Sequence, residues 1–407
     1  MVKEKINFKV EQASINITNN QVDSIRFKNT NKTGFRVYDN NLIGVSGIVG
    51  EYNEDEMFNK AIDNLNNKIE YKASPEKNKK EKIKLINIKE TDTQFLENIK
   101  SLVEKLHNKY PDIIFSNKVN LSKKTYSIKN DAGLDYEYSD GYYSFSILFK
   151  EKTSTNLMDM AFEGISRNYD EKKIIEDISE MIDNYKIKKD IEVGTYPIII
   201  DFRYFSNYIL SNTMATLVMS KASLFSNKIG QKVFSDNVTI IDDRNPQTAI
   251  CSPFFDMEGV VNENYQFKLV DRGVFTTPTV SKKEAITYNL PLTGSAYSTY
   301  DSVPRCTPDN LVVLKSDKTL KELLNGEKGI YVVFASGGDF TQSGDYASPV
   351  QLAYLVEDGK ITGRLDNLTI TGNIFDMFGK NFIGRCKDSM FQYSDVCPLV
   401  IKMNVIK

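Results

Sequence analysis

The sequence predicts an α+β protein with two domains: N-terminal helices packed on an antiparallel sheet, then a mainly β C-terminal domain with a buried helix. The chain has 407 residues, which exceeds the usual size of one hydrophobic core. Its first half mixes strand-like alternation with segments of helical spacing. Its second half consists mostly of short strand-like runs between Gly, Asn and Asp turns. We therefore place the boundary near residue 190, between an α+β domain at 1–190 and a mainly β domain at 191–407.

The N-terminal domain begins with strands and then turns helical. Residues 6–50 alternate apolar and polar side chains in short runs, which predicts meandering strands. Residues 54–69 have helical spacing with acids in the first turn, where the helix dipole favours them. Residues 72–84 are rich in Lys and Glu and predict a solvated loop. Residues 92–111 predict a second helix. Its expected buried face consists of Phe95, Ile99, Leu102, Val103 and Leu106.

Strand-like alternation returns at residues 118–150, where the pair Asp140-Gly141 is typical of a hairpin turn. A third helix is predicted at 171–187, followed by a buried strand at 195–202. Later strands are predicted at 268–277, 351–372 and 398–406.

Residues 205–225, FSNYILSNTMATLVMSKASLF, have the length and apolar weight of a buried helix, yet Ser206, Asn207 and Ser211 lie in its first turns. The apolar side chains point around the whole circumference. Such a pattern predicts a helix buried inside a domain or between subunits. These apolar residues are Tyr208, Ile209, Leu210, Met214, Leu217 and Val218.

Charge and hydropathy exclude several classes of protein. The net charge is −2 and the lysines are interspersed with acids, so no basic stripe indicates a nucleic-acid partner. No apolar run approaches the ~20 residues of a membrane-spanning helix. The N-terminal residues lack the apolar core of a secretion signal, so we expect a cytoplasmic protein without a membrane partner.

Cysteine and histidine are the residues that restrict the chemistry most. The four cysteines show no CxxC spacing, which argues against a disulfide framework and a zinc knuckle. The single histidine, His107, excludes any site that needs two imidazoles from this chain. We expect His107 to have a surface or capping role near the end of its helix.

Three further features favour structural roles. Gly44, Gly47 and Gly50 do not have phosphate-loop spacing, and we expect them to ease strand packing. The adjacent acids Asp242 and Asp243 would face opposite ways on a strand, so we expect them to start a turn rather than share a proton. The Gly-rich segment 336–349 is expected to be a structured loop between strands.

Several ordered segments resemble one known family, the TldD/TldE metallopeptidases, also called PmbA or modulator of DNA gyrase. The resemblance covers nearly the whole chain. The segments that carry it are 34–48, 223–243, 253–260, 269–297 and 353–378.

In this family, the resemblance implies, a TldD-type subunit binds catalytic zinc through an H-E-x-x-x-H helix and a cysteine near the C-terminus. A TldE-type subunit lacks the motif and pairs with TldD. Counting back without gaps from the segment SNKIGQ places the motif's positions on Ser206, Asn207 and Ser211. The segment FDMEG at 255–259 also favours the TldE type. The resemblance therefore implies a TldE/PmbA-like chain without catalytic zinc. The zinc would be held only by a TldD-like partner. Whether this chain is itself an enzyme is left open.

The implied function is to assist a TldD-like catalytic subunit that degrades unfolded peptides or trims leader peptides from modified precursors. Partners would be that subunit, or a second copy of this chain, and an extended peptide. Cys386 and Cys397 are candidates for a vestigial zinc ligand, although we expect ordinary thiols. Candidate peptide contacts are Ser336, Gly337, Gly338, Asp339, Ser343 and Asp345. Two alternatives remain: a homodimeric peptide-binding scaffold without protease activity, and an independent hydrolase with Cys386, Cys397 or Ser343 as nucleophile.

Overall fold

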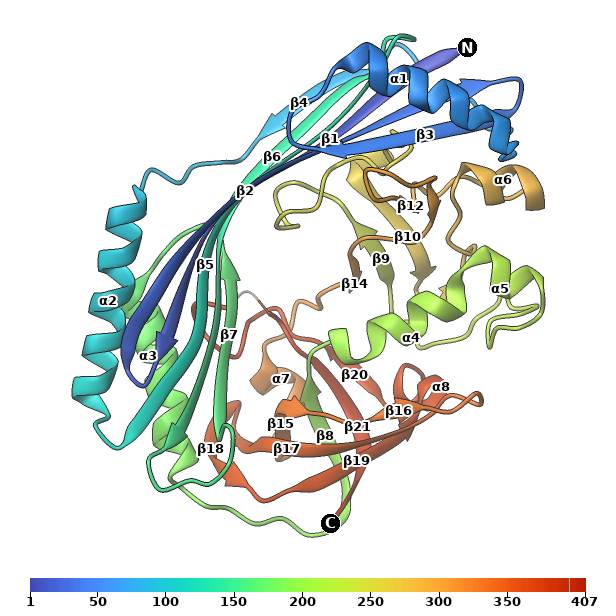
Figure 1. Ribbon diagram of the computed structural model, residues 1–407. Coiled ribbons are helices and arrows are strands. Elements are labelled where there is room, and N and C mark those ends of the chain that lie inside the picture. The colour runs from blue at the N-terminus through green and yellow to red at the C-terminus, as the bar shows by residue number, and fades with distance from the viewer. Residues whose placement is uncertain (395) are drawn as a thin grey trace.

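A long sheet from the first half of the chain arches over the second half (Figure 1). The computed structural model describes residues 1–394 and 396–407. The sheet has seven strands in the order β3-β2-β1-β5-β6-β4, with β7 also paired to β6, and all pairs are antiparallel except β4 with β6. The strands are β1 (Val2–Thr18), β2 (Gln21–Asp39), β3 (Leu42–Val49), β4 (Lys80–Lys84), β5 (Ile113–Asn130), β6 (Asp135–Glu151) and β7 (Met160–Ser166).

Two predictions for this sheet were wrong. Residues 80–84, predicted as part of a loop, form the edge strand β4, in which Ile83 lies opposite Tyr138 of β6. The lysines of β4 obscure the apolar–polar alternation by which a strand is recognised in the sequence. Charged side chains are common on exposed edge strands, where they prevent pairing with other chains. Asp140-Gly141 is not a hairpin turn but lies within β6, because Asp140 is buried and accepts two hydrogen bonds from Arg167.

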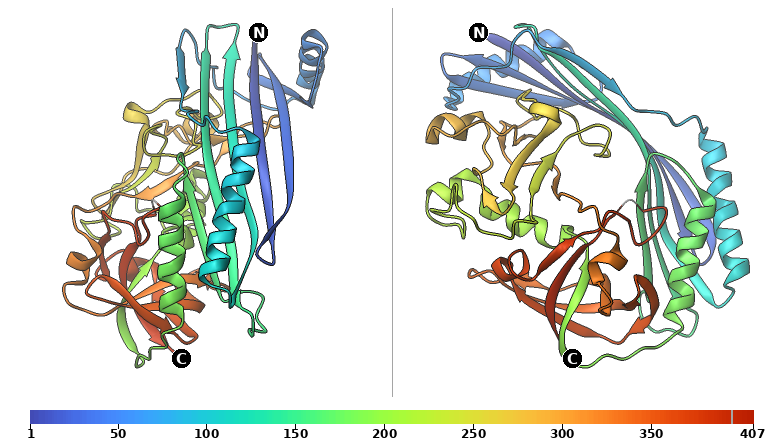
Figure 2. Two further views of the ribbon diagram at one scale, coloured as in Figure 1. Left: turned by 90° about the vertical axis from the view of Figure 1, so that its left-hand side faces the viewer. Right: turned by 180° about the vertical axis from the view of Figure 1, so that it is seen from behind.

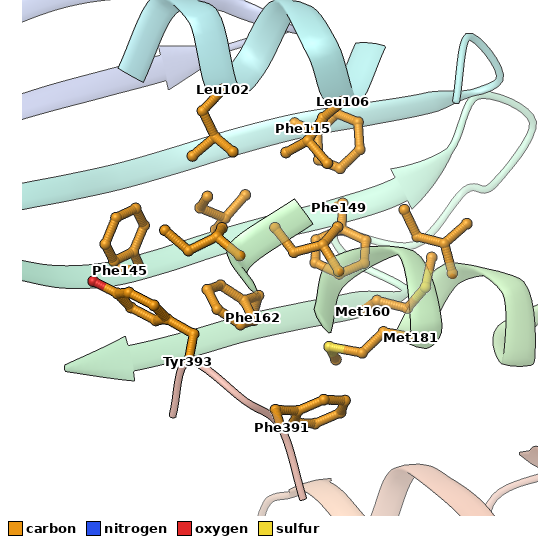
Figure 3. Packing of buried hydrophobic residues seen from close by; sticks show 14 of the residues in the cluster. Leu102, Leu106, Phe115, Phe145, Phe149, Met160, Phe162, Met181, Phe391 and Tyr393 are labelled. Atoms are coloured by element: carbon orange, nitrogen blue, oxygen red, sulfur yellow. The ribbon is translucent and has the colours of Figure 1, made fainter. Parts of the chain in front are cut away.

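Four helical segments belong to this half: α1 (Glu54–Asp63), η1 (Asn64–Asn67), α2 (Asp92–Lys109) and α3 (Glu171–Tyr185). α2 begins at a capping box formed by Thr91 and Gln94. Its five predicted core residues are all buried, and Leu106 lies beside Phe115 in the cluster that also contains Leu102 (Figure 3). Near the end of α2, Asn20 Nδ2 lies 3.0 Å from His107 Nδ1.

The predicted packing role is confirmed for Gly44 and Gly47 of β3 but was wrong for Gly50, which follows β3 with φ +94° and would have no atom within 4 Å of a Cβ. A Cβ at Gly44 would lie 1.9 Å from the carbonyl oxygen of Ala61, and one at Gly47 would meet Tyr300 and Asp301. Both glycines therefore permit close packing against β3.

The second half contains a closed barrel of five strands, because β15 pairs with β8 on one side and β17 on the other. The ring runs β15 (Gly329–Ala335), β8 (Gly194–Ile200), β21 (Leu399–Ile406), β19 (Leu368–Asn373) and β17 (Asp345–Glu357). Three short strands extend it: β16 (Asp339–Phe340), β18 (Lys360–Leu365) and β20 (Phe382–Arg385).

Between the barrel and the long sheet lies a smaller sheet in the order β11-β10-β9-β14 (Figure 1). Its strands are β9 (Ile240–Asp243), β10 (Gln266–Asp271), β11 (Val274–Phe275) and β14 (Leu311–Val313), with the separate pair β12 (Ala296–Tyr297) and β13 (Arg305–Cys306). The helices are α4 (Arg203–Thr213), α5 (Ala215–Met219), η2 (Glu263–Tyr265), α6 (Lys282–Tyr288), α7 (Leu320–Leu324) and α8 (Ile374–Met377).

In the view from behind, the long sheet curves around one side of the second half (Figure 2), and the two halves share buried side chains. One hydrophobic cluster includes Phe162 and Met181 from the first half and Tyr354 from the second. Across the described residues, no strand of β1–β7 pairs with a later strand. The boundary near residue 190 lies in the connection between α3 and β8 and stays a prediction. No helix of the described chain is long and apolar enough to cross a membrane.

Candidate functional site

α4 follows the barrel strand β8 and ends at a sharp change of backbone direction. Met214 has extended angles, φ −66° and ψ 133°, and separates α4 from α5. Here Ala215 N donates to Thr279 O at 3.0 Å, and Thr279 N donates to Thr213 O at 2.9 Å. The prediction of one helix over 205–225 was therefore wrong, because a distant segment replaces the helical hydrogen bonds.

Only one side of α4 is buried. Phe205 and Ile209 are fully buried, whereas Tyr208 is half-buried and Asn207 is exposed. On α5, Leu217 is 36% exposed to solvent. Within this chain the apolar residues are thus not covered all round, so the prediction of a helix buried inside a domain was wrong. Burial between subunits stays a prediction.

The exposed side of α4 faces a pocket of about 350 Å³. Tyr204, Asn207, Tyr208 and Ser211 line it, and their spacing places them on one helix face. The opposite wall is the chain from 335 to 340, which includes β16. Two hydroxyls fix α4 to this wall: Tyr204 OH accepts from the N–H of Ala335 at 3.2 Å, and Tyr208 OH donates to Thr341 O at 3.0 Å.

Four of the six predicted peptide contacts line this pocket. They are Ser336, Gly337, Gly338 and Asp339. The segment is a loop that continues into β16, which pairs with β17 alone among the described strands. The pocket therefore lies beside an exposed strand edge.

The other two predicted contacts lie outside the pocket lining and hold a turn together. Ser343 Oγ donates to Asp345 Oδ2 at 2.7 Å, and Asn373 Nδ2 donates to Asp345 Oδ1 at 2.9 Å. Hydrogen bonds from Asn373 and Ser343 lower the pKa of Asp345. Ser343 thus contacts a carboxylate, but that carboxylate is bound to Asn373 and its low pKa makes it a poor base.

The three positions on which the sequence analysis placed the H-E-x-x-x-H motif differ in their surroundings. Ser206 Oγ donates to Arg203 O at 3.3 Å, and Ser211 Oγ donates to Tyr208 O at 3.0 Å, so both hydroxyls bond their own helix. Asn207 is exposed to the pocket. Two hydroxyls and an amide do not fit a zinc ion, which prefers imidazole, thiolate and carboxylate ligands.

The two C-terminal cysteines are buried and lie outside the pocket lining. Cys386 follows β20 and belongs to a hydrophobic cluster, and burial raises the pKa of its thiol to about 12. The thiol is protonated near neutral pH and is then no zinc ligand. Cys397 Sγ donates to Lys387 O at 3.5 Å. Over residues 1–394 and 396–407, no group of three or more His, Cys, Asp and Glu side chains is arranged to hold a metal.

Sequence reasoning named Tyr208 only as a buried apolar residue, and it missed Tyr204 and a second pocket at the start of α4. Tyr204 lines both pockets, and the second, of about 330 Å³, also includes the ion pair Arg203–Asp201, with 2.7 Å between Nε and Oδ2. The available signals were the aromatic pair at 204 and 208, one helical turn apart, and the carboxylate that directly follows β8.

Asp242 and Asp243 make separate contacts, as predicted. Asp242 Oδ2 lies 3.4 Å from Arg244 Nε, whereas Asp243 Oδ1 accepts from the N–H of Asn245 at 3.0 Å and starts the turn there. They do not form a catalytic dyad.

A closed five-stranded barrel with α4 beside the short strand β16, under a long curved sheet, is an arrangement found in solved proteins of one class. TldE from Thermococcus kodakarensis has the same fold, with a TM-score of 0.83 over 100% of this chain and 97% of that chain at 16% identity. A proposed modulator of a DNA gyrase from Thermotoga maritima MSB8 gives a TM-score of 0.81 over 99% and 96% at 20% identity.

Residues 193–406 match the family model described as the PmbA/TldA metallopeptidase C-terminal domain. The chain belongs to the PmbA/TldD metallopeptidase family. It is 31% identical over 168 residues to a metalloprotease of Methanocaldococcus jannaschii, which is 41% of this chain and 37% of that protein. A TldD homolog of Buchnera aphidicola from Acyrthosiphon pisum is 30% identical over 162 residues, 39% of this chain and 33% of that protein. These matches span less than two fifths of the relatives' length.

Proposed function

We propose that this chain is the non-catalytic, TldE/PmbA-like subunit of a cytoplasmic TldD/TldE-type zinc metallopeptidase. The observation that carries the proposal is the donor set on α4, where Ser206, Asn207 and Ser211 offer no ligand of the kind zinc prefers. The single His107 lies on α2, in the other half of the chain. Zinc would then belong to a TldD-like partner, and this chain would contribute to holding the substrate.

The substrate of the complex would be an extended peptide, either an unfolded chain or the leader of a modified precursor. The unpaired edge of β16 supports this assignment, because main-chain pairing to a strand edge binds many sequences alike. Beside that edge, Gly337 and Gly338 leave the backbone accessible, and Asn207 can donate to or accept from a peptide group.

The test is co-purification of this chain with a TldD-like subunit from the same genome, followed by peptidase assays of each protein and of the mixture. We expect cleavage only in the mixture, its loss on chelation and its recovery with zinc. Stoichiometric zinc and zinc-dependent cleavage in this chain alone would refute the proposal. A stable homodimer that binds peptides and ignores the TldD-like subunit would instead establish the scaffold alternative.

A hydrolase with its own nucleophile is disfavoured by the surroundings of each candidate. The thiol of Cys386 is buried with a raised pKa, and the buried thiol of Cys397 donates to Lys387 O. The hydroxyl of Ser343 bonds to the hydroxyl of Thr341 and to the carboxylate of Asp345, which is a poor base. The same assay separates this alternative, because it predicts cleavage by the isolated chain that survives chelators.

A further inference from the structure

A further cleft lies between the two halves of the chain and shares no lining residue with the α4 pocket. Its volume is about 340 Å³. One wall is the face of β1, β2 and β5, and the other comes from segments 251–257 and 296–301. The matched family model covers residues 193–406, so the sheet wall of this cleft lies outside it.

Strand register places the side chains of the sheet wall in rows. Phe8 of β1 lies opposite Lys32 of β2 and Tyr126 of β5, and Val10 lies opposite Lys124 of β5. The rings of Phe8 and Tyr126 meet edge to face, with centroids 5.6 Å apart. An aromatic centre is thus flanked by lysines. The cleft lysines are Lys28, Lys32 and Lys124.

The cleft carries an excess of positive charge, although the whole chain has a net charge of −2. The cleft lysines form no salt bridge with any residue that the structure describes. Two carboxylates line the cleft, and one of them, Asp309, lies 3.9 Å from Arg244 and accepts from Ser252 Oγ at 2.5 Å. The other, Asp301, accepts from Thr299 Oγ1 at 2.8 Å. Among the described residues, three lysines without a salt bridge therefore line the cleft together with one carboxylate, Asp301, that has no cationic partner.

The wall opposite the sheet is held in place from the sheet itself. The buried guanidinium of Arg36 on β2 donates to Met257 O and to Ser298 Oγ, and it pairs with Glu4 at 3.2 Å. Met257 and Ser298, which both belong to the second half, line the cleft. The cleft is consequently preformed, which lowers the cost of binding.

We propose that this cleft binds an acidic segment of an extended peptide, with carboxylate side chains at the cleft lysines and an apolar or aromatic side chain on Phe8 and Tyr126. The inference rests on the proposed function and names the class of peptide that the chain prefers. Charge complementarity favours this occupant, and the cleft lysines would also speed its association.

The test measures fluorescence anisotropy of labelled short peptides with the full chain. The peptides share one Gly/Ser/Tyr framework and carry glutamates, glutamines or lysines at the centre, each with a free or an amidated C-terminus. The variant K28Q/K32Q/K124Q is compared with K9Q/K123Q/K129Q, which removes the same charge from the opposite face of β1 and β5.

We expect the glutamate peptide to bind about tenfold more tightly than the lysine peptide, with the advantage retained after amidation and lost in the cleft variant only. Equal affinity for all peptides, or an equal loss in both variants, would overturn the inference and leave peptide holding intact. If amidation of the C-terminus abolished the tighter binding of the glutamate peptide, the site would bind a terminal carboxylate, and the inference would be overturned. Tighter binding of a single-stranded oligonucleotide than of the glutamate peptide would also overturn the inference. If no peptide bound at all, the proposed function would be refuted as well.

Discussion

The ring of Tyr208 stacks on the ring of Phe340, with centroids 4.0 Å apart and an angle of 11° between the planes. This contact joins the middle of α4 to the edge strand β16, and Tyr208 OH extends it through a hydrogen bond to Thr341 O. The position of the strand edge, and with it the shape of the pocket, therefore depends on contacts made by α4.

The first prediction concerns this aromatic pair. Tyr208→Ala and Phe340→Ala should each destabilise the chain, and a double-mutant cycle in urea should give a coupling of about 0.5–1.5 kcal/mol. Tyr208→Phe keeps the stack and serves as the control for the hydroxyl. Peptide affinity should fall in both alanine variants. Additive effects on stability would show that the stack does not hold the strand in place.

Gly338 and Gly337 offer a matched pair of substitutions beside the pocket. A Cβ at Gly338 would lie 2.3 Å from the side chain of Ser348, whereas one at Gly337 would meet open space but require φ +78°. Gly338→Ala should therefore displace the segment, cost about 1–3 kcal/mol and weaken peptide binding. Gly337→Ala should cost about 1 kcal/mol and weaken binding less than Gly338→Ala, because its methyl group meets no other atom and need not displace the segment. Equal effects on binding would argue against a role for the backbone beside Ser348.

Arg36 joins the two halves, and its loss should be severe. Its side chain and that of Glu4 are 0% and 1% exposed. Arg36→Met should lower the free energy of unfolding by about 3–5 kcal/mol, because it leaves Glu4 buried without its cation. The double variant Glu4→Gln/Arg36→Met should recover part of this loss. Urea denaturation measures both, and no recovery would mean that the contacts to Met257 and Ser298 dominate.

The raised pKa of Glu258 predicts how the free energy of unfolding depends on pH. Burial, together with the charge of Asp256, raises the pKa of Glu258 from 4.5 to about 7. Between these values the folded chain holds the proton that the unfolded chain releases. The stability due to this group is thus present below pH 4.5 and is lost as the pH rises to 7, by at most about 3 kcal/mol. The difference in unfolding free energy between wild type and Glu258→Gln should fall from pH 5 to pH 8; a constant or rising difference would contradict the assignment.

How far the sequence predicted this molecule depends on how local the cause of each feature is. The stripe on α2 and its capping box are local, and the helix was predicted correctly. The break at Met214 is not local, because it depends on hydrogen bonds with Thr279, 65 residues later in the chain. Asp140-Gly141 has the composition of a turn, yet Arg167 holds Asp140 inside a strand.

The candidate site shows the same division. The segment 336–339 could be proposed from its glycines, but its position opposite α4 follows from barrel closure between β15 and β17. Tyr208 was predicted to be core and Tyr204 was not predicted at all, whereas the structure gives both a role at the pocket wall. The cleft lysines lie on two strands that are not neighbours in the sheet, so no linear pattern could indicate them.

The last prediction separates the thiols by accessibility. Burial raises the pKa of both Cys306 and Cys386 to about 12, and Cys397 is also buried. Only Cys251 is partly exposed, and burial raises the pKa of its thiol as well. Since the thiolate is the reactive species, iodoacetamide at pH 8 should modify Cys251 slowly and the other three only after unfolding. Peptide mapping by mass spectrometry counts the modified sites. Fast alkylation of Cys386 in the folded chain would reveal an accessible thiolate and would revive the hydrolase alternative.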